Sequence, residues 1–304
     1  MPLHPFVSGM LKQLGGRPAL SDGTPQDARD MMTAAREVYG EGPKMAEVHY
    51  IELPTRSGSI PARLLVPAGD VVGVVVYLHG GGWVIGGIDD FDAVGRELAA
   101  ASGCAVLLPD YRLAPEAPFP APLHDCEDAL LWAAEQAASR FGAPVPLIVA
   151  GDSAGGNLAA VLAQRHHQTT PIALQVLIYP VTDCDFTRPS YSAHGAGLIL
   201  KSGDMAWFFD HYAPAADWMH PDISPLRADD LAGLPPAVVT LAEYDVLHDE
   251  GLAYADAMAA AGVPVTQRVV EGMTHGFIRL HNLCDPARAE VERLGAEIRA
   301  ACAA

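Results

Sequence analysis

Residues 146–163 of this 304-residue chain read Pro146-Leu-Ile-Val-Ala-Gly-Asp-Ser-Ala-Gly155 and then Gly156-Asn-Leu-Ala-Ala-Val-Leu-Ala163. The apolar run before Gly151 predicts a buried strand, and the small apolar residues after Gly155 predict a helix. A Gly-x-Ser-x-Gly pattern between them is typical of a strained turn that lifts a serine hydroxyl above a parallel sheet. Glycines suit this turn because the two backbones come too close for side chains. The pattern therefore predicts a nucleophile at Ser153.

The composition narrows the class of protein. Half of the residues are hydrophobic, enough for a large core, and only 18% are charged, which argues against long disordered segments. The formal net charge is −18 without a visible cluster of Lys and Arg, so we expect no nucleic-acid partner. An uninterrupted apolar run of about 18 residues is absent, so we expect no membrane span and no membrane partner.

The cysteines and histidines show neither a disulfide framework nor a metal-binding pattern. The five cysteines are widely spaced without a C-x-x-C pair, and the 12 histidines lack the spacing of metal ligands. This pattern favours reduced thiols in a cytoplasmic protein, with no metal. The first residues also lack the basic start and apolar stretch of a signal peptide. The cysteines are Cys104, Cys126, Cys184, Cys284 and Cys302.

Dense apolar runs alternate with helical patterns along most of the chain. Apolar strands separated by amphipathic helices predict a mostly parallel sheet with helices on both faces, an α/β fold. Helices are expected at 27–39, 91–101, 123–140, 154–168, 204–212, 249–261 and 286–301. Eight strands are expected, at Val48–Leu53, Ala62–Val66, Val71–Leu78, Ala105–Leu108, Leu147–Ala150, Leu174–Tyr179, Ala237–Ala242 and Val265–Val270.

One long segment interrupts this alternation. No strand is expected between Asp183 and Pro236, and an aromatic helix at Asp204–Tyr212 lies within that segment. An insertion of this length after a strand is typical of a cap over the carboxyl edge of the sheet, which the helical N-terminal segment could join. We therefore expect two cap segments, 1–45 and 183–225, and two core segments, 46–182 and 226–304.

Two later loops supply partners for Ser153. A serine hydroxyl needs a base at neutral pH, and in an α/β-hydrolase arrangement the acid and then the histidine follow later strands. Asp245 follows the strand at 237–242, and His275 follows the strand at 265–270. The expected triad is Ser153, His275 and Asp245. Glu243 or Asp249 remains an alternative acid, with Asp245 as a helix N-cap, and His248 remains an alternative base.

A glycine-rich loop follows the strand at 71–78. It reads His79-Gly-Gly-Gly-Trp83 and leaves backbone N–H groups unshielded. Two of these donors, with the N–H of Ala154, are suited to holding a developing oxyanion. A phosphate loop or a dinucleotide site is a weak alternative, because the Walker and G-x-G-x-x-G patterns are absent. Asp152, beside Ser153, is expected to point away from it and to have a structural hydrogen-bonding role.

These motifs together resemble the hormone-sensitive-lipase-like family of bacterial carboxylesterases, family IV of the α/β-hydrolase superfamily. The resemblance implies an eight-stranded α/β-hydrolase core under a helical cap, and hydrolysis of short- to medium-chain acyl esters without a cofactor. It also implies that Gly81, Gly82 and Ala154 form the oxyanion hole around the triad. The matching segments are His79–Trp83, Pro109–Glu116, Phe119–Ala121, Gly151–Asn157, Leu234–Pro236, Tyr244–Asp245 and His275–Phe277.

The chain departs from the family pattern in the loop that carries Asp245. Val246 stands where the family usually has proline, and His248 stands where it usually has arginine. The first change loosens the loop and the second removes a permanent charge. Neither touches the chemistry of the triad.

Substrate and partner predictions are less constrained. Leu198, Ile199, Trp207 and Phe208 are candidates for an acyl pocket with Trp83 as its other wall, unless they only bind the cap to the core. The strand at 265–270 should be a sheet edge through which a homodimer could form. The alternatives to an esterase acting on a small-molecule ester are an amidase or formamidase, a catalytically silent small-ligand receptor, and an interfacial lipase.

Overall fold

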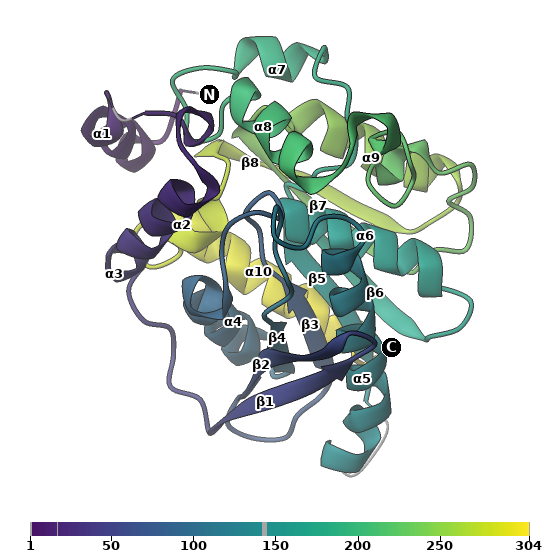
Figure 1. Ribbon diagram of the computed structural model, residues 1–304. Coiled ribbons are helices and arrows are strands. Elements are labelled where there is room, and N and C mark those ends of the chain that lie inside the picture. Colours follow the sequence, from purple (N-terminus) through teal and green to yellow (C-terminus); the bar gives the residue numbers. More distant parts are fainter. Residues whose placement is uncertain (1, 17, 142–144, 304) are drawn as a thin grey trace.

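The structure is a computed structural model that describes residues 2–16, 18–141 and 145–303. Its centre is an eight-stranded sheet with the order β1-β2-β4-β3-β5-β6-β7-β8 (Figure 1). Strand β2 pairs antiparallel with both β1 and β4, and the remaining neighbouring strands are parallel, so that the sheet is mostly parallel, as predicted. The strands are β1 (Glu47–Thr55), β2 (Gly58–Val66), β3 (Val74–Leu78), β4 (Ala105–Pro109), β5 (Leu147–Asp152), β6 (Ile172–Ile178), β7 (Ala237–Tyr244) and β8 (Val265–Thr274).

Helices cover both faces of the sheet, which explains its apolar strands. Every residue of β3, β4 and β5 is buried, because a parallel strand between two helical layers meets no solvent. The helices are α1 (Pro5–Leu14), α2 (Pro25–Ala34), α3 (Arg36–Tyr39), α4 (Ile88–Ser102), α5 (Ala121–Phe141), α6 (Ala154–His166), α7 (Pro189–Ala193), α8 (Ser202–Tyr212), α9 (His248–Ala260) and α10 (Asp285–Ala301).

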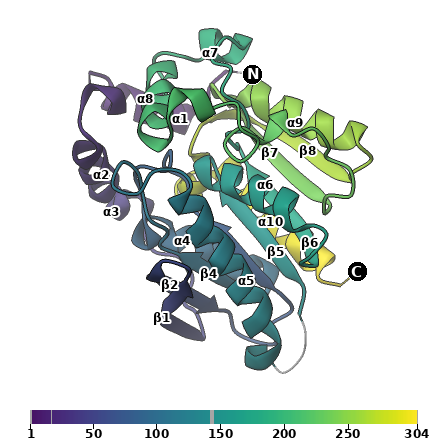
Figure 2. The same cartoon turned by 45° about the vertical axis from the view of Figure 1, so that its right-hand side comes forward.

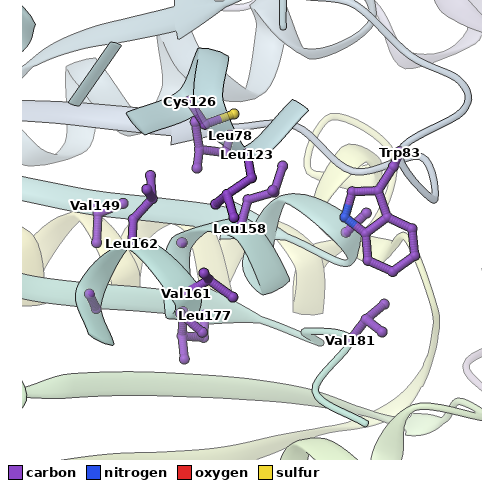
Figure 3. Packing of buried hydrophobic residues seen from close by; sticks show 14 of the residues in the cluster. Leu78, Trp83, Leu123, Cys126, Val149, Leu158, Val161, Leu162, Leu177 and Val181 are labelled. Atoms are coloured by element: carbon purple, nitrogen blue, oxygen red, sulfur yellow. The ribbon is translucent and has the colours of Figure 1, made fainter. Parts of the chain in front are cut away.

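The core forms one layer on each face of the sheet. Helices α4 and α10 pack together on one face, with Val94 and Leu294 among its buried side chains. Helices α5, α6 and α9 cover the other face. In that second layer Leu158 of α6 and Leu123 of α5 meet Leu78 of β3 (Figure 3). The alternating side chains of each strand thus divide between two cores.

Two segments distant in sequence lie at the same end of the molecule. Both views show α7 and α8 beyond the strands, near the purple N-terminal helices (Figure 1, Figure 2). Asp204 of α8 is fully buried and accepts hydrogen bonds from the N–H and the hydroxyl of Ser21, at 3.0 and 2.8 Å. The division of the chain into cap and core segments at 45, 183 and 225 stays a prediction.

The predicted bounds of several elements need correction: β3 begins at Val74 and not at Val71, and β8 continues to Thr274, past its predicted end at Val270. The single helix expected at 27–39 is two helices, because the chain turns at Ala35 and Arg36 then pairs with Asp90 of α4 at 2.7 Å. The second strand begins at Gly58, four residues before its predicted start, because a tight hairpin pairs Gly58 with Thr55. The expected sheet edge at β8 is confirmed. Pairing of two copies along β8 stays a prediction.

In the described part of the chain, no helix is both long and apolar enough to span a bilayer.

The turn between β5 and α6 is compressed. Ser153 has φ 54° and ψ −119°, a conformation that costs a non-glycine residue strain. The first turn of α6 lies against the end of β3, so that a Cβ on Gly155 would overlap the carbonyl oxygen of Leu78. A hydrogen bond from the N–H of Ser153 to the carbonyl of Ile178, at 2.9 Å, fixes the turn from the other side. The packing of strand and helix therefore imposes the backbone conformation of Ser153.

We predict that Gly155→Ala lowers the free energy of unfolding by about 1–3 kcal/mol, the cost of overpacking a filled core. Urea denaturation followed by circular dichroism measures it. Gly9→Ala is the matched control, because an added methyl group at Gly9 meets no atom within 4 Å. Equal stability of the two variants would contradict the close approach of α6 to β3.

Candidate active site

Three loops bring a serine, a histidine and a carboxylate into one hydrogen-bonded chain. Ser153 follows β5, Asp245 follows β7 and His275 follows β8, all at the carboxyl edge of the parallel strands. The Oγ of Ser153 lies 3.0 Å from Nε2 of His275, and Nδ1 of His275 lies 2.7 Å from Oδ2 of Asp245. The side chain of Asp245 is fully buried, and that of His275 is 12% exposed. This geometry allows Nε2 to accept the serine proton while Asp245 orients the ring.

The alternative acids and base have other partners. Glu243 accepts a hydrogen bond from the N–H of Gly272 at 2.6 Å, and Asp249 accepts one from the N–H of Ser190 at 2.8 Å. Nδ1 of His248 lies 2.9 Å from the carbonyl oxygen of Ala242. The structure therefore brings Asp245 and His275, and none of these alternatives, into the chain that ends at Ser153.

The loop that carries Asp245 is held despite its departures from the family pattern. Asp245 Oδ1 accepts the N–H of Leu247 at 3.0 Å, which fixes the carboxylate against its own loop. Val246 is buried, and its carbonyl accepts a hydrogen bond of 2.6 Å from the hydroxyl of Ser190 in α7. His248 adds the contact to Ala242. Tertiary hydrogen bonds thus restrain the loop where a proline ring would have done so.

Asp152 connects the turn at Ser153 to the glycine-rich loop. Its Oδ1 accepts hydrogen bonds from the N–H of Gly80 and the hydroxyl of Tyr77, both at 2.9 Å. Burial raises the pKa of Asp152, and these two hydrogen bonds oppose that shift. The residue beside the candidate nucleophile therefore positions the loop, in agreement with the structural role expected from the sequence.

His79 fixes the start of the same loop. Its ring stacks between those of Tyr111 and Phe91, with centroids 4.3 and 5.3 Å away. Its Nδ1 lies 2.8 Å from the carbonyl oxygen of Gly80. Burial lowers the pKa of His79, so the imidazole is held neutral. The neutral side chain of His79 thus anchors the loop by ring stacking and by its contact with Gly80, without an ionic interaction.

The glycines after His79 are required by their surroundings. Gly81 and Gly82 have φ 123° and 58°, and a Cβ on Gly82 would overlap the ring of Phe208. Within the described residues, the N–H groups of Gly81, Gly82 and Ala154 donate to no other protein group. Free N–H groups beside a serine hydroxyl are suited to stabilising an oxyanion.

A cleft of about 460 Å³ opens onto these groups. Ser153, His275, Gly81 and Gly82 line it, as do three of the five predicted pocket residues, Leu198, Ile199 and Phe208. Most of the remaining lining is apolar, which is typical of small-molecule sites. The cleft therefore joins the hydrogen-bonded chain to a largely apolar space.

The predicted positions of the two tryptophans need correction. Trp83 is fully buried, stacked on Tyr212 at 4.2 Å and edge-on to Phe209 at 5.3 Å. Trp207 is partly buried against Phe208 and His211 and lies outside the cleft lining. The ring of Trp83 packs against α8, because large aromatic rings bury much apolar area between layers, whereas Trp207 lies on α8 itself and its ring contacts are within that helix.

Sequence reasoning missed one wall of the cleft. The N-terminal segment lines this wall of the cleft with apolar side chains. Arg279, four residues after His275, also lines the cleft. The apolar spacing in 1–45 was a signal for a buried helix face, but it could not show which element that face would meet. The N-terminal lining includes Met10, Leu11, Leu14, Leu20, Ala28, Met31, Met32 and Tyr39.

The fold and this site agree with comparisons to known proteins. Residues 75–279 match a family described as having an alpha/beta hydrolase fold. The chain belongs to the hormone-sensitive-lipase-like family of α/β hydrolases and is a carboxylic ester hydrolase.

Two bacterial enzymes and one archaeal protein of known structure are among the proteins that resemble this chain. Carboxylic ester hydrolase LipN of Mycobacterium tuberculosis is 40% identical over 270 residues, covering 85% of this chain and 72% of LipN. Ethyl acetate hydrolase of Pseudomonas putida is 35% identical over 303 residues, covering 94% and 95% of the two chains. The hyperthermophilic esterase of the archaeon Pyrobaculum calidifontis superposes with a TM-score of 0.94 at 36% identity, with 100% of both chains covered.

A buried carboxyl group at the start of α9 binds the segment that follows β6 and helix α7. Glu250 of α9 accepts the N–H of Thr182 at 2.8 Å and the hydroxyl of Tyr191 in α7 at 2.9 Å. Burial raises the pKa of Glu250 to about 8, against its usual 4.5, while the hydrogen bonds oppose the shift. Between these two pH values the folded protein holds a proton that the unfolded chain has lost.

We predict that this proton makes stability depend on pH. The free energy of unfolding should fall as pH rises from about 4.5 to about 8, with a slope approaching about 1.4 kcal/mol per pH unit. Glu250→Gln keeps the neutral shape and should remove this part of the slope. Urea titrations of both proteins across the range measure it. Parallel curves for the two proteins would contradict a neutral Glu250.

Proposed function

We propose that the protein hydrolyses short- to medium-chain acyl esters through a covalent acyl-serine intermediate. The observation that carries this proposal is the Ser153–His275–Asp245 chain, with contacts of 3.0 and 2.7 Å at the mouth of an apolar cleft. The relative named ethyl acetate hydrolase acts, by its name, on an ester with a short acyl group, which supports the short end of this range.

In the first half-reaction the Ser153 hydroxyl attacks the ester carbonyl. His275 Nε2 takes the serine proton, and the buried carboxylate of Asp245 stabilises the imidazolium that forms. The negative charge on the carbonyl oxygen is stabilised by the N–H groups of Gly81, Gly82 and Ala154. Each such donor typically contributes about 10²–10³ in rate. His275 then protonates the leaving alcohol, and the acyl group stays on Ser153.

In the second half-reaction water replaces the alcohol. His275 removes a proton from the water, which attacks the acyl-serine carbonyl under the same oxyanion donors. Collapse of the tetrahedral intermediate returns the proton to Ser153 and releases the acid. All protons in both half-reactions pass through the imidazole of His275. The protein contributes only side chains and backbone N–H groups to these steps. The hydrogen-bonded His275 also argues against a silent receptor.

We predict that Ser153→Ala lowers kcat for a p-nitrophenyl butyrate substrate by at least about 10⁴-fold, because the nucleophile and its proton are lost. Initial-rate assays measure the effect, and thermal unfolding serves as the control for folding. Hydrolysis near the wild-type rate by a folded Ser153→Ala protein would refute the acyl-serine scheme. Matched butyramide and butyrate substrates in the same assay separate an amidase from an esterase.

The ring of Phe208 lies against Gly82 and limits the cleft there. We predict that Phe208→Ala raises the ratio of kcat/KM for p-nitrophenyl octanoate to that for the butyrate by about tenfold, equivalent to burying roughly two further methylene groups. Trp207→Ala is the matched control, since the ring of Trp207, the residue before Phe208, lies outside the cleft lining. An unchanged chain-length profile in Phe208→Ala would remove Phe208 from the acyl pocket.

A further inference from the structure

Arg279 lies in the wall of the cleft beside the proposed catalytic residues. It belongs to the short helix Phe277–Leu280, directly after the loop that carries His275. Its guanidinium carbon lies 4.2 Å from the ring centroid of Tyr39 and 5.1 Å from that of Phe91. Both rings line the same cleft. Two aromatic faces, one from the N-terminal helices and one from α4, thus hold the cation in place.

The described residues leave part of the hydrogen-bonding capacity of this guanidinium unmet. Nε and Nη2 of Arg279 are buried and have no partner among the described residues. The ion pairs between described residues do not include Arg279, although arginines such as Arg29, Arg112 and Arg268 are each paired with a carboxylate. Burial of unpaired charged donors is costly, so the arrangement favours a ligand that accepts hydrogen bonds.

The charges that line the cleft favour an anionic ligand. Apart from His275, the readily ionised side chains in the lining are Asp152, Lys201 and Arg279. Asp152 is already bonded to Tyr77 and Gly80. The cleft therefore offers positive charge, although the whole chain carries −18. Under physiological conditions salt screens interactions between exposed charges more than about 8 Å apart. The guanidinium of Arg279 in the cleft therefore affects a bound ligand more than the net negative charge of the distant surface does.

We propose that Arg279 binds a carboxylate of the substrate, so that the preferred substrates are esters with a carboxylate remote from the scissile bond. Half-esters of dicarboxylic acids are the simplest members of this class. A planar guanidinium matches a carboxylate through two parallel hydrogen bonds, and the stacked rings fix its orientation beforehand. This inference rests on the proposed ester hydrolysis and adds a specificity determinant to it.

The test compares matched charged and neutral esters. Monoethyl esters of succinic to suberic acid are each paired with the ethyl ester of the straight-chain monocarboxylic acid of equal carbon number. A second series pairs acetoxy carboxylic acids with alkyl acetates, which moves the carboxylate to the alcohol side. The readout is the ratio of kcat/KM for the charged ester to that for its neutral partner, measured by pH-stat.

We expect Arg279→Gln to lower this ratio by about 10- to 100-fold in at least one series, as for a lost hydrogen bond between charged groups. Arg279→Lys should retain part of it. Lys201→Gln is the matched control for a general charge effect and should change the ratio by less than about fivefold. A ratio that Arg279→Gln leaves unchanged in both series would overturn the proposal.

Two further readouts keep the outcome interpretable. If Arg279→Gln does not fold, added salt should lower kcat/KM of the wild type for the half-ester more than for its neutral partner. A ratio below one that does not respond to salt would overturn the proposal. Failure of the proposed function looks different, since neither ester would then be hydrolysed in a Ser153-dependent way.

Discussion

The close approach of α6 to β3 is the constraint on which the site depends. Gly155 brings the first turn of the helix against the carbonyl of Leu78, where a side chain has no room. The turn can close only if Ser153 adopts a left-handed conformation, with φ 54°. The packing of strand and helix compensates for the strain in the backbone of Ser153. This backbone conformation places the Ser153 hydroxyl at the edge of the sheet where the loops after β7 and β8 meet.

The same turn organises the other half of the site. Asp152 precedes Ser153, and its carboxylate holds the N–H of Gly80 at 2.9 Å. A change in the turn would therefore move the proposed nucleophile and the proposed oxyanion donors together. His79, stacked between two rings, prevents the loop from shifting independently. The proposed nucleophile and the proposed oxyanion donors are therefore held as one unit, which is what electrostatic preorganisation requires.

The sequence predicted those parts of the molecule that local patterns specify. All eight strands and the meeting of Ser153, Asp245 and His275 followed from apolar runs and from the rule that parallel strands end at one edge. The places of Trp83 and Trp207 did not follow. Their partners, such as Tyr212 for Trp83, lie on a segment inserted between strands, and no periodicity encodes how such a segment docks.

Arg279 illustrates the same limit for the proposed substrate specificity. Its neighbourhood combines Tyr39, Phe91 and the loop of His275, which are distant in sequence and meet only in the folded chain. A single arginine in a sequence carries no signal of whether a carboxylate of the protein neutralises it. The motifs therefore predicted which residues meet at the candidate site, whereas the proposed substrate class depends on tertiary contacts.

The most direct measurement traps the acyl group on the protein. Mixing the protein with p-nitrophenyl butyrate, quenching in acid within milliseconds and digesting should yield the peptide that contains Ser153 with the added mass of a butyryl group. We expect this adduct at Ser153 and its absence in Ser153→Ala. Rapid turnover with no acylated peptide, or with the acyl group on another residue, would refute the acyl-serine mechanism.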